Sequence, residues 1–264
     1  MEFNGLILTS QIFFLLFVRV FAMMQFVPLL SSGSIPRIAK LALALLSAAL
    51  VFPTVQAAGY PIPASGLAYA MLAIGEAMIG IITGFMLAIV YAAFQTAGQM
   101  FSLQMGFGAS QVFDPLAQIE IPLLGQFLNL VAMFTFIFTA GFQRIFLIGV
   151  HESFLAVRAI DIVLLREDIV QSMIQGLGQL FANALIISFP ILGTLFLVQV
   201  VMGLLAKAAP QMNLLMLGFP LSIGVAFILL LITIPFLMQA FDRLIGIGFD
   251  QLRDFFTGAA EVGN

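Results

Sequence analysis

The stretch AMIGIITGFMLAIVYAAFQTAGQMFSLQMGFGASQVF, from Ala77 to Phe113, contains no charged residue. Four more stretches without any charge cover residues 41–75, 121–143, 169–206 and 208–240. A helix needs about 20 apolar residues to cross a bilayer, so each of these stretches is long enough to hold a spanning helix. The pattern predicts an all-α membrane protein.

The composition of the chain leads to the same prediction. Of its 264 residues, 62% are hydrophobic and 8% are charged, and the mean hydropathy is +1.19. A soluble domain carries about a quarter charged residues, so lipid or the apolar surfaces of partner subunits must surround this chain. Its nine Lys and Arg residues are scattered singly and the net charge is −3, which argues against nucleic acid as a partner.

Charged residues, glycines and prolines divide the chain into about six apolar, kinked helices. We expect these helices at roughly 6–30, 38–58, 67–103, 123–150, 177–206 and 214–240. A charged connector would occupy residues 151–176, and an amphipathic tail would occupy residues 241–264. Glu2 is acidic where a signal peptide would be basic, so we expect the first helix to be retained.

Residue types that carry enzyme chemistry are scarce in this sequence. It has no cysteine and a single histidine, His151, which excludes disulfides, thiolate metal sites and sites with several histidines. No nucleophile–base–acid set, metal-ligand spacing or phosphate-binding loop can be assembled from the remaining residues. We therefore expect no catalytic, cofactor-binding or metal-binding residues.

Two charged residues fall inside predicted apolar helices, Arg19 and Glu76. An ionisable group at membrane depth is costly and is a functional candidate for that reason. For Glu76 we favour a structural role, as a buried partner of Arg19 or of a neighbouring subunit, over a proton relay. Gly80 and Gly84 follow it at the spacing of small residues that lets two helices approach closely.

A second informative stretch is GQMFSLQMGFGASQVFDP, from Gly98 to Pro115. Its glycines and the Asp114-Pro115 pair end the preceding helix and leave a loop rich in apolar side chains. Flexible apolar side chains on such a loop are suited to closing a hole reversibly. On the residues alone, an ordinary loop packed against its own helices is equally compatible.

A third informative stretch is GLLAKAAPQMNLLMLGFP, from Gly203 to Pro220. It predicts a tight hairpin between the last two apolar helices, with Pro210 in the turn. Asn213 is a candidate N-cap of the helix that follows.

With these stretches the chain resembles the FliR family, the R subunit of the flagellar type III protein-export gate, which is related to the T subunit of injectisomes. The resemblance runs over nearly the whole chain. Four segments carry it: 19–28, 76–80, 104–115 and 204–220. Lys207 stands where arginine would be expected most often, a departure that keeps the charge.

The resemblance implies a single copy assembled with several P and Q subunits (FliP and FliQ) into a closed helical ring. The B and A subunits (FlhB and FlhA), unfolded export substrates and membrane lipid would be further partners. Residues 1–150 would be similar to a P subunit, and the hairpin 177–240 to a Q subunit. Such an assembly would belong to the bacterial inner membrane and the flagellar basal body.

The resemblance also implies roles for two groups of residues. A plug inside the pore, within about 104–122, would include Met105, Gly106, Phe107, Gly108, Phe113, Asp114 and Pro115. A hairpin at the cytoplasm-facing entrance, next to other subunits, would include Lys207, Pro210, Gln211, Met212, Asn213, Gly218 and Pro220.

The function expected from the residues and the resemblance together is that of a non-enzymatic export-gate subunit. It would help to form and seal the channel for unfolded flagellar proteins and would be needed for flagellum assembly. The alternative is a secondary transporter for a small solute or ion, since such proteins use broken helices and buried charges like Glu76. The scarcity of polar binding groups and the lack of a clear inverted repeat favour the gate.

Overall fold

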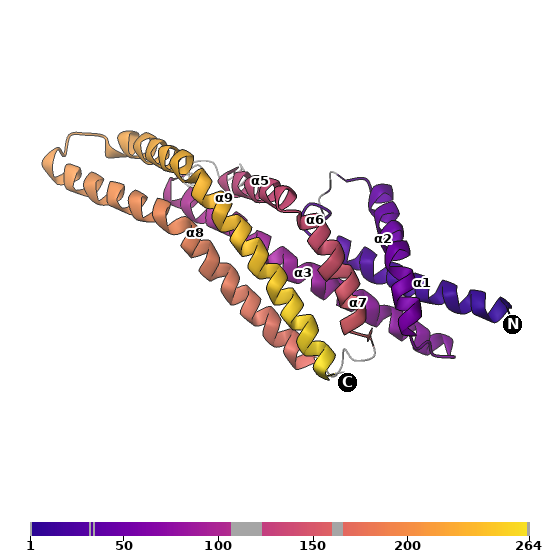
Figure 1. Ribbon diagram of the computed structural model, residues 1–264. Helices are drawn as coiled ribbons and strands as arrows, with labels where there is room; N and C mark the ends of the chain where they lie inside the picture. The colour runs from indigo at the N-terminus through magenta and orange to yellow at the C-terminus, as the bar shows by residue number, and fades with distance from the viewer. Residues whose placement is uncertain (1, 32, 34, 107–122, 160–165, 263–264) are drawn as a thin grey trace. The chain divides into compact units, whose positions relative to one another are not determined.

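The computed structural model describes residues 2–31, 33, 35–106, 123–159 and 166–262 (Figure 1). Within these residues the chain is helical, without a β-strand, and the all-α class is confirmed. The helices are α1 (Glu2–Met24), α2 (Arg37–Ala58), α3 (Gly66–Gln104), α5 (Leu123–Phe138), α6 (Gly141–Arg144), the π-helix η1 (Ile145–Glu152), α7 (Ser153–Ala156), α8 (Arg166–Ala208) and α9 (Leu214–Val262).

Among the described residues, five helices are long and apolar enough to cross a bilayer: α1, α2, α3, α8 and α9. The pair formed by α5 and the segment from Gly141 to Ala156 makes a sixth if it counts as one broken span. The chain is therefore a multi-pass membrane protein.

Four helix limits differ from those predicted. The first helix, expected to end near residue 30, ends at Met24. The helix expected at 123–150 is interrupted at Ala140, whose left-handed φ of 56° ends α5, and it continues as α6 and the π-helix η1. The helix expected from 177 begins at Arg166, inside the expected connector. The last helix continues through Pro220 and Pro235 and through the expected tail.

The tail is helical because its apolar residues recur every three or four positions. Phe241, Ile245, Phe249, Leu252 and Phe256 are each at most 2% exposed, whereas Asp242, Arg243, Asp250, Arg253 and Asp254 are exposed. The apolar residues therefore form one face of a helix, and α9 continues through the tail as an amphipathic helix.

The contacts divide the chain into two compact units. Unit 1 consists of residues 1–90, 136–177 and 245–264. In it α2 packs on α1 (Figure 1). Phe13 and Phe52 make an edge-to-face contact there, with their ring centroids 6.0 Å apart. The core of this unit includes Leu15, Leu16, Val20 and Met23, each 1% exposed.

Helix α3 approaches α1 closely in unit 1, because Gly80 and Gly84 have no side chain. A Cβ atom at Gly80 would lie 2.2 Å from the carbonyl oxygen of Arg19, and one at Gly84 would lie 2.6 Å from that of Met23. The two backbones therefore touch, in the manner of small-residue packing between membrane helices.

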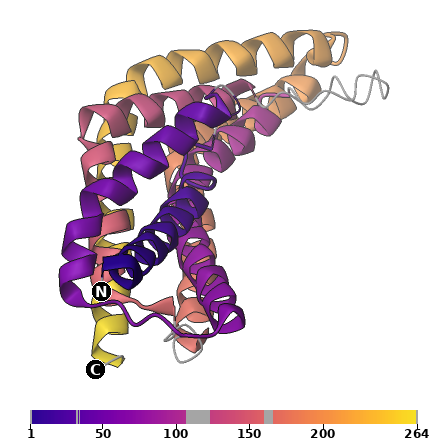
Figure 2. The ribbon, with the colours of Figure 1, turned by 90° about the vertical axis from the view of Figure 1, so that its right-hand side faces the viewer.

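Unit 2 consists of residues 91–135 and 178–244. Here α3 and α5 meet at two glycines, since a Cβ atom at Gly98 would lie 2.5 Å from Cα of Gly125. Phe94 and Phe241 pack with their ring centroids 4.2 Å apart. The unit 2 portions of α8 and α9 run side by side from the short turn at 209–213, which Figures 1 and 2 both show.

We predict that Gly80→Ala destabilises unit 1 by about 1–3 kcal/mol, the range for overpacked cores, because the added methyl group would meet backbone rather than a flexible side chain. Gly178→Ala in α8 is the matched control: a Cβ atom added there would have nothing within 4 Å, and alanine favours the helix. Thermal unfolding of the purified protein in detergent measures both. Equal melting temperatures for the two variants would contradict the close packing.

Candidate functional site: a buried arginine cluster

The guanidinium group of Arg19 lies at the centre of unit 1, where the residue is 2% exposed. Its Nε donates to Oε2 of Glu76 at 2.5 Å. Its Nη1 donates to the carbonyl oxygen of Ser153 at 2.7 Å, and its Nη2 donates to that of Val157 at 2.8 Å. Its Cζ lies 3.9 Å from the ring centroid of Phe154, so the cation also gains from the aromatic face.

The carboxylate of Glu76 is fully buried and both of its oxygens accept hydrogen bonds. The second donor is the hydroxyl of Tyr60, in the connection between α2 and α3. Burial raises the pKa of Tyr60, and the neighbouring Glu76 raises it further. The phenol therefore stays protonated at neutral pH and remains a donor to the carboxylate.

This cluster joins four segments that are far apart in the sequence. Arg19 comes from α1, Glu76 from α3, Tyr60 from the connection before α3, and Ser153 and Val157 from α7 and its end. Since a buried charge is tolerated only when it is paired and hydrogen-bonded, the cluster is formed only when all four segments are in place. The geometry suits an anchor better than a proton relay, because both carboxylate oxygens are already engaged.

A second ion pair involves the segment of η1 and α7 that Arg19 also contacts. Glu152, at the end of η1, accepts from Nε and Nη2 of Arg253 at 3.2 and 3.0 Å. This bidentate geometry is the stronger form of an arginine–carboxylate pair. It ties the C-terminal part of α9 to the π-helix within unit 1, where Phe249 also packs on Phe136 at 6.3 Å.

Sequence reasoning singles out Arg19 and Glu76, and the structure brings these two side chains together. It does not single out Tyr60, Ser153 or Val157. Two of the acceptors are backbone carbonyls, which leave no mark in the sequence. Tyr60 carries a weak signal, since it lies between two predicted spans and its hydroxyl needs a partner when buried.

The residues expected to form a plug lie largely outside the described residues, which include only Met105 and Gly106 of that set. Met105 is 1% exposed and its amide donates to the carbonyl oxygen of Phe101 at 2.9 Å. Gly106 has a φ of 92°, and a Cβ atom there would lie 2.2 Å from the ring of Phe219. Phe107, Gly108, Phe113, Asp114 and Pro115 belong to the part that the structure does not describe.

The expected hairpin residues lie at the turn between α8 and α9 and on both sides of it. Lys207 is exposed near the end of α8, and Pro210, Gln211 and Met212 lie in the turn. Oδ1 of Asn213 accepts from the amide of Met216 at 3.2 Å, so Asn213 is the N-cap of α9. Gly218 and Pro220 lie in the first turns of α9.

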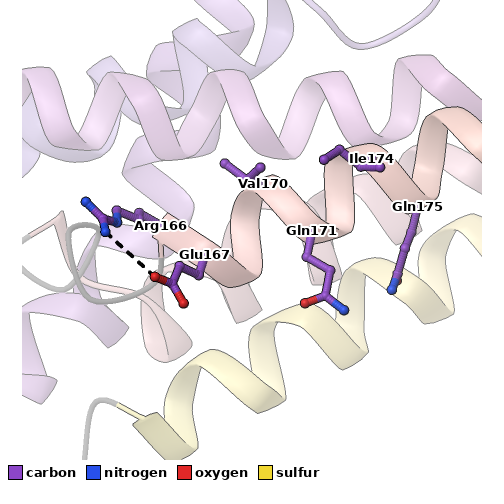
Figure 3. A pocket seen from close by; sticks show the side chains of 6 residues that line it. All are labelled: Arg166, Glu167, Val170, Gln171, Ile174 and Gln175. Atoms are coloured by element: carbon purple, nitrogen blue, oxygen red, sulfur yellow. Dashed lines mark ion pairs between the residues drawn. The ribbon is translucent and has the colours of Figure 1, made fainter.

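A shallow cavity of about 580 Å³ lies along the first turns of α8 (Figure 3). It is lined by Arg166, Glu167, Val170, Gln171, Ile174 and Gln175. The glutamines leave the helix on one side, and the aliphatic side chains leave it on the other (Figure 3). Arg166 and Glu167 form an exposed ion pair at 3.7 Å, which contributes little to stability.

Comparison with known proteins agrees with the resemblance noted in the sequence. A family model described as "Bacterial export proteins, family 1" matches residues 10–247. A curated protein of Borreliella burgdorferi, the flagellar biosynthetic protein FliR, is 30% identical over 97% of this chain and 94% of its own length. The chain belongs to the FliR family.

Two further FliR proteins show the same coverage. The FliR protein of Bacillus subtilis is 27% identical over 95% of this chain and 96% of its own length. That of Escherichia coli is 26% identical over 94% of this chain and 93% of its own length. The match to FliR relatives therefore includes both compact units rather than one of them.

We predict that Arg19→Ala destabilises the protein by about 3–5 kcal/mol, the range for removing one partner of a buried ion pair, because Glu76 would stay buried without its counter-charge. Arg158→Ala is the matched control, since Arg158 is exposed in the same unit, and a change within about 0.5 kcal/mol is expected there. Thermal unfolding in detergent measures both variants. Equal losses of stability in the two would contradict the anchoring role of Arg19.

Glu76→Gln keeps the shape and one accepting oxygen but removes the counter-charge of Arg19, so we predict a loss of thermal stability as for Arg19→Ala, while the protein that folds still supports export. Motility and the secretion of export substrates measure this outcome. Complete loss of export from a normally assembled variant would argue against a purely structural Glu76 and indicate proton chemistry there.

Proposed function

We propose that this chain is a non-enzymatic subunit of the flagellar type III export gate, in the bacterial inner membrane at the flagellar basal body. It would help to form and seal the channel for unfolded flagellar proteins. The observation that carries the proposal is the match to FliR of Borreliella burgdorferi over 97% of the chain, because that protein is named as a flagellar biosynthetic protein.

The amount of exposed apolar surface supports a function inside a larger assembly. Only 22% of the most apolar window of α8, and 22% of that of α9, is buried within the chain. Phe189 is 71% exposed and Phe196 is 59% exposed on α8. Such faces need lipid or other apolar helices, and the P and Q subunits FliP and FliQ are the neighbours that we propose, with FlhB and FlhA as further partners.

The sealing role rests on the expected plug, whose residues begin with Met105. Its first two residues are held in unit 2, with Met105 in the core and Gly106 against Phe219. A plug that starts from such a fixed point would return to the same position after a substrate has passed. The rest of the proposed plug, up to about residue 122, lies beyond the described residues.

We predict that the tagged chain, co-expressed with FliP and FliQ, purifies in a large particle that holds one copy of it and several copies of each partner. Native mass spectrometry in detergent measures the composition. Phe189→Lys should reduce incorporation, because a charge would be buried against a partner or lipid, whereas Gln199→Lys, also exposed on α8, should incorporate normally.

A lone monomer or a symmetric homo-oligomer under the same conditions would overturn the proposed function as an export-gate subunit and would favour a transporter. Motility of a FliR-deficient strain that carries this chain provides an independent measurement. A strain that stays non-motile when it carries this chain would contradict the proposal.

We predict that deleting residues 106–110 makes the membrane permeable to small ions while the subunit still enters the complex. The loop would then be too short to fill the pore. Ion leakage from cells that express the variant, compared with its content in the purified particle, measures the effect. Unchanged permeability in an assembled complex would contradict the plug.

A further inference from the structure

A row of uncharged polar side chains follows the contact between α3 and α5 in unit 2. The two helices touch at Gly98 and Gly125, and a Cβ atom at Gly125 would lie 3.4 Å from Cγ of both Gln95 and Gln99. These two glutamines are one turn apart on α3, so they lie on the same face of it. We define the amide surface as Gln95, Gln99 and Ser102 of α3 with Gln126 and Asn129 of α5.

Helical periodicity separates the amide surface from the core of unit 2. The buried flanks of the two helices carry side chains that are at most 5% exposed: Phe94, Ala97 and Phe101 on α3, and Leu124, Leu128 and Ala132 on α5. The polar residues lie on the other side of the Gly98–Gly125 contact. Gln126 is exposed and the remaining four are half-buried, so the amide surface faces away from the core.

Hydrocarbon is an unsuitable neighbour for the amide surface, because an amide without a hydrogen bond is costly in an apolar solvent. Helix α3 is nevertheless long and apolar enough to span a bilayer, and it carries these amides in its last turns. A closely packed partner helix is also unsuitable. Such packing uses small residues, and Gly98 and Gly125 already contact each other.

The absence of charge identifies the class of ligand. Residues 77–113 and 121–143 contain no charged side chain, so the amide surface offers no counter-charge to an ion or a phosphate. Side-chain amides donate and accept neutral hydrogen bonds. A peptide backbone presents the complementary set, with one donor and one acceptor on nearly every residue.

The spacing of the glutamines fits a backbone that is extended. Residues four apart in a helix are about 6 Å apart along its axis. In an extended chain every second residue is equivalent, at a repeat of about 6.6–6.8 Å. Gln95 and Gln99 can therefore bond equivalent groups on one edge of an extended polypeptide. Such contacts do not depend on the side chains of that polypeptide, which suits unfolded chains of different sequence.

We propose that the amide surface hydrogen-bonds the extended backbone of an unfolded polypeptide in transit. Gln95 and Gln99 replace part of the water around the backbone from α3, and Gln126 and Asn129 do so from α5. This role rests on the proposed export function and adds to it the chemical group that is bound, the peptide backbone.

Disulfide trapping tests the contact, because the chain has no cysteine of its own and Gln99→Cys introduces a single one. The variant is co-expressed with FliP and FliQ and with an export substrate fused to a stably folded domain, which stalls it in the gate. The unfolded part of the substrate carries one cysteine. We expect at least tenfold more disulfide to substrate for Gln99→Cys than for Gln199→Cys, an exposed control position on α8 of the same unit. Two substrates of unrelated sequence should give the same result.

Assembly and stalling are measured first, as the composition of the particle without any introduced cysteine. A particle that holds substrate but gives no disulfide at Gln99→Cys, or an equal yield at Gln199→Cys, would overturn the role of the amide surface and leave the export function standing. A disulfide to a neighbouring subunit in place of the substrate would show a partner interface and overturn it too. A particle that never holds substrate would overturn both proposals.

Secretion provides a second measurement. Gln95→Leu combined with Gln99→Leu should lower the secretion rate roughly tenfold, the factor for about two neutral hydrogen bonds, in a normally assembled particle. The corresponding pair of asparagine substitutions keeps the amides and should restore much of the rate, and Gln199→Leu should leave it unchanged. Unchanged secretion by the double leucine variant would overturn the proposed contact.

Discussion

Burial of the Arg19 guanidinium is the constraint on which the rest of unit 1 depends. A charge in an apolar interior is tolerated only with a full set of partners, and Arg19 takes its partners from α3, from the start of α7 and from the residue after α7. Gly80 makes this possible. Because its backbone touches the carbonyl oxygen of Arg19, Glu76, one turn earlier on α3, is brought within hydrogen-bonding distance of the guanidinium. Small-residue packing and the ion pair are thus two parts of one arrangement.

The π-helix explains how one short segment serves two arginines. An i→i+5 hydrogen-bond pattern widens the helix and changes the direction of the residues that follow, and such segments recur at functional positions. Directly after η1, the carbonyl oxygens of Ser153 and Val157 accept from Arg19, while the carboxylate of Glu152, the last residue of η1, binds Arg253. The N-terminal helix and the C-terminal part of α9 are therefore fastened to the same stretch of chain, although they are far apart in sequence.

The sequence predicts much of this structure, and what it misses has physical causes. Long uncharged stretches predict the apolar helices, and the cost of Glu76 at membrane depth identifies one half of the cluster. The start of α8 escapes prediction because Arg166 and Glu167 look like a solvated connector, although an acid in the first turn is also a helix signal. The break at Ala140 escapes it because proline is absent there and the one glycine, Gly141, begins the next helix. The carbonyl acceptors of Arg19 leave no sequence signal at all, and the plug residues beyond Gly106 remain predictions.

Arg19, Arg253 and Lys40 differ in how far their charged groups are buried. Arg19 is buried with a complete set of acceptors, and Arg253 is half-exposed with a bidentate carboxylate, so both act within unit 1. Lys40 is 7% exposed as a residue, but its ammonium is not among the buried side-chain atoms without a partner in the described residues, so its stem is covered while its charge stays accessible. Arg19 and Lys40 therefore differ in which of their atoms the surrounding helices cover. Arg19 buries its charged group and takes its counter-charge and acceptors from the chain, whereas Lys40 buries its stem and leaves its ammonium accessible.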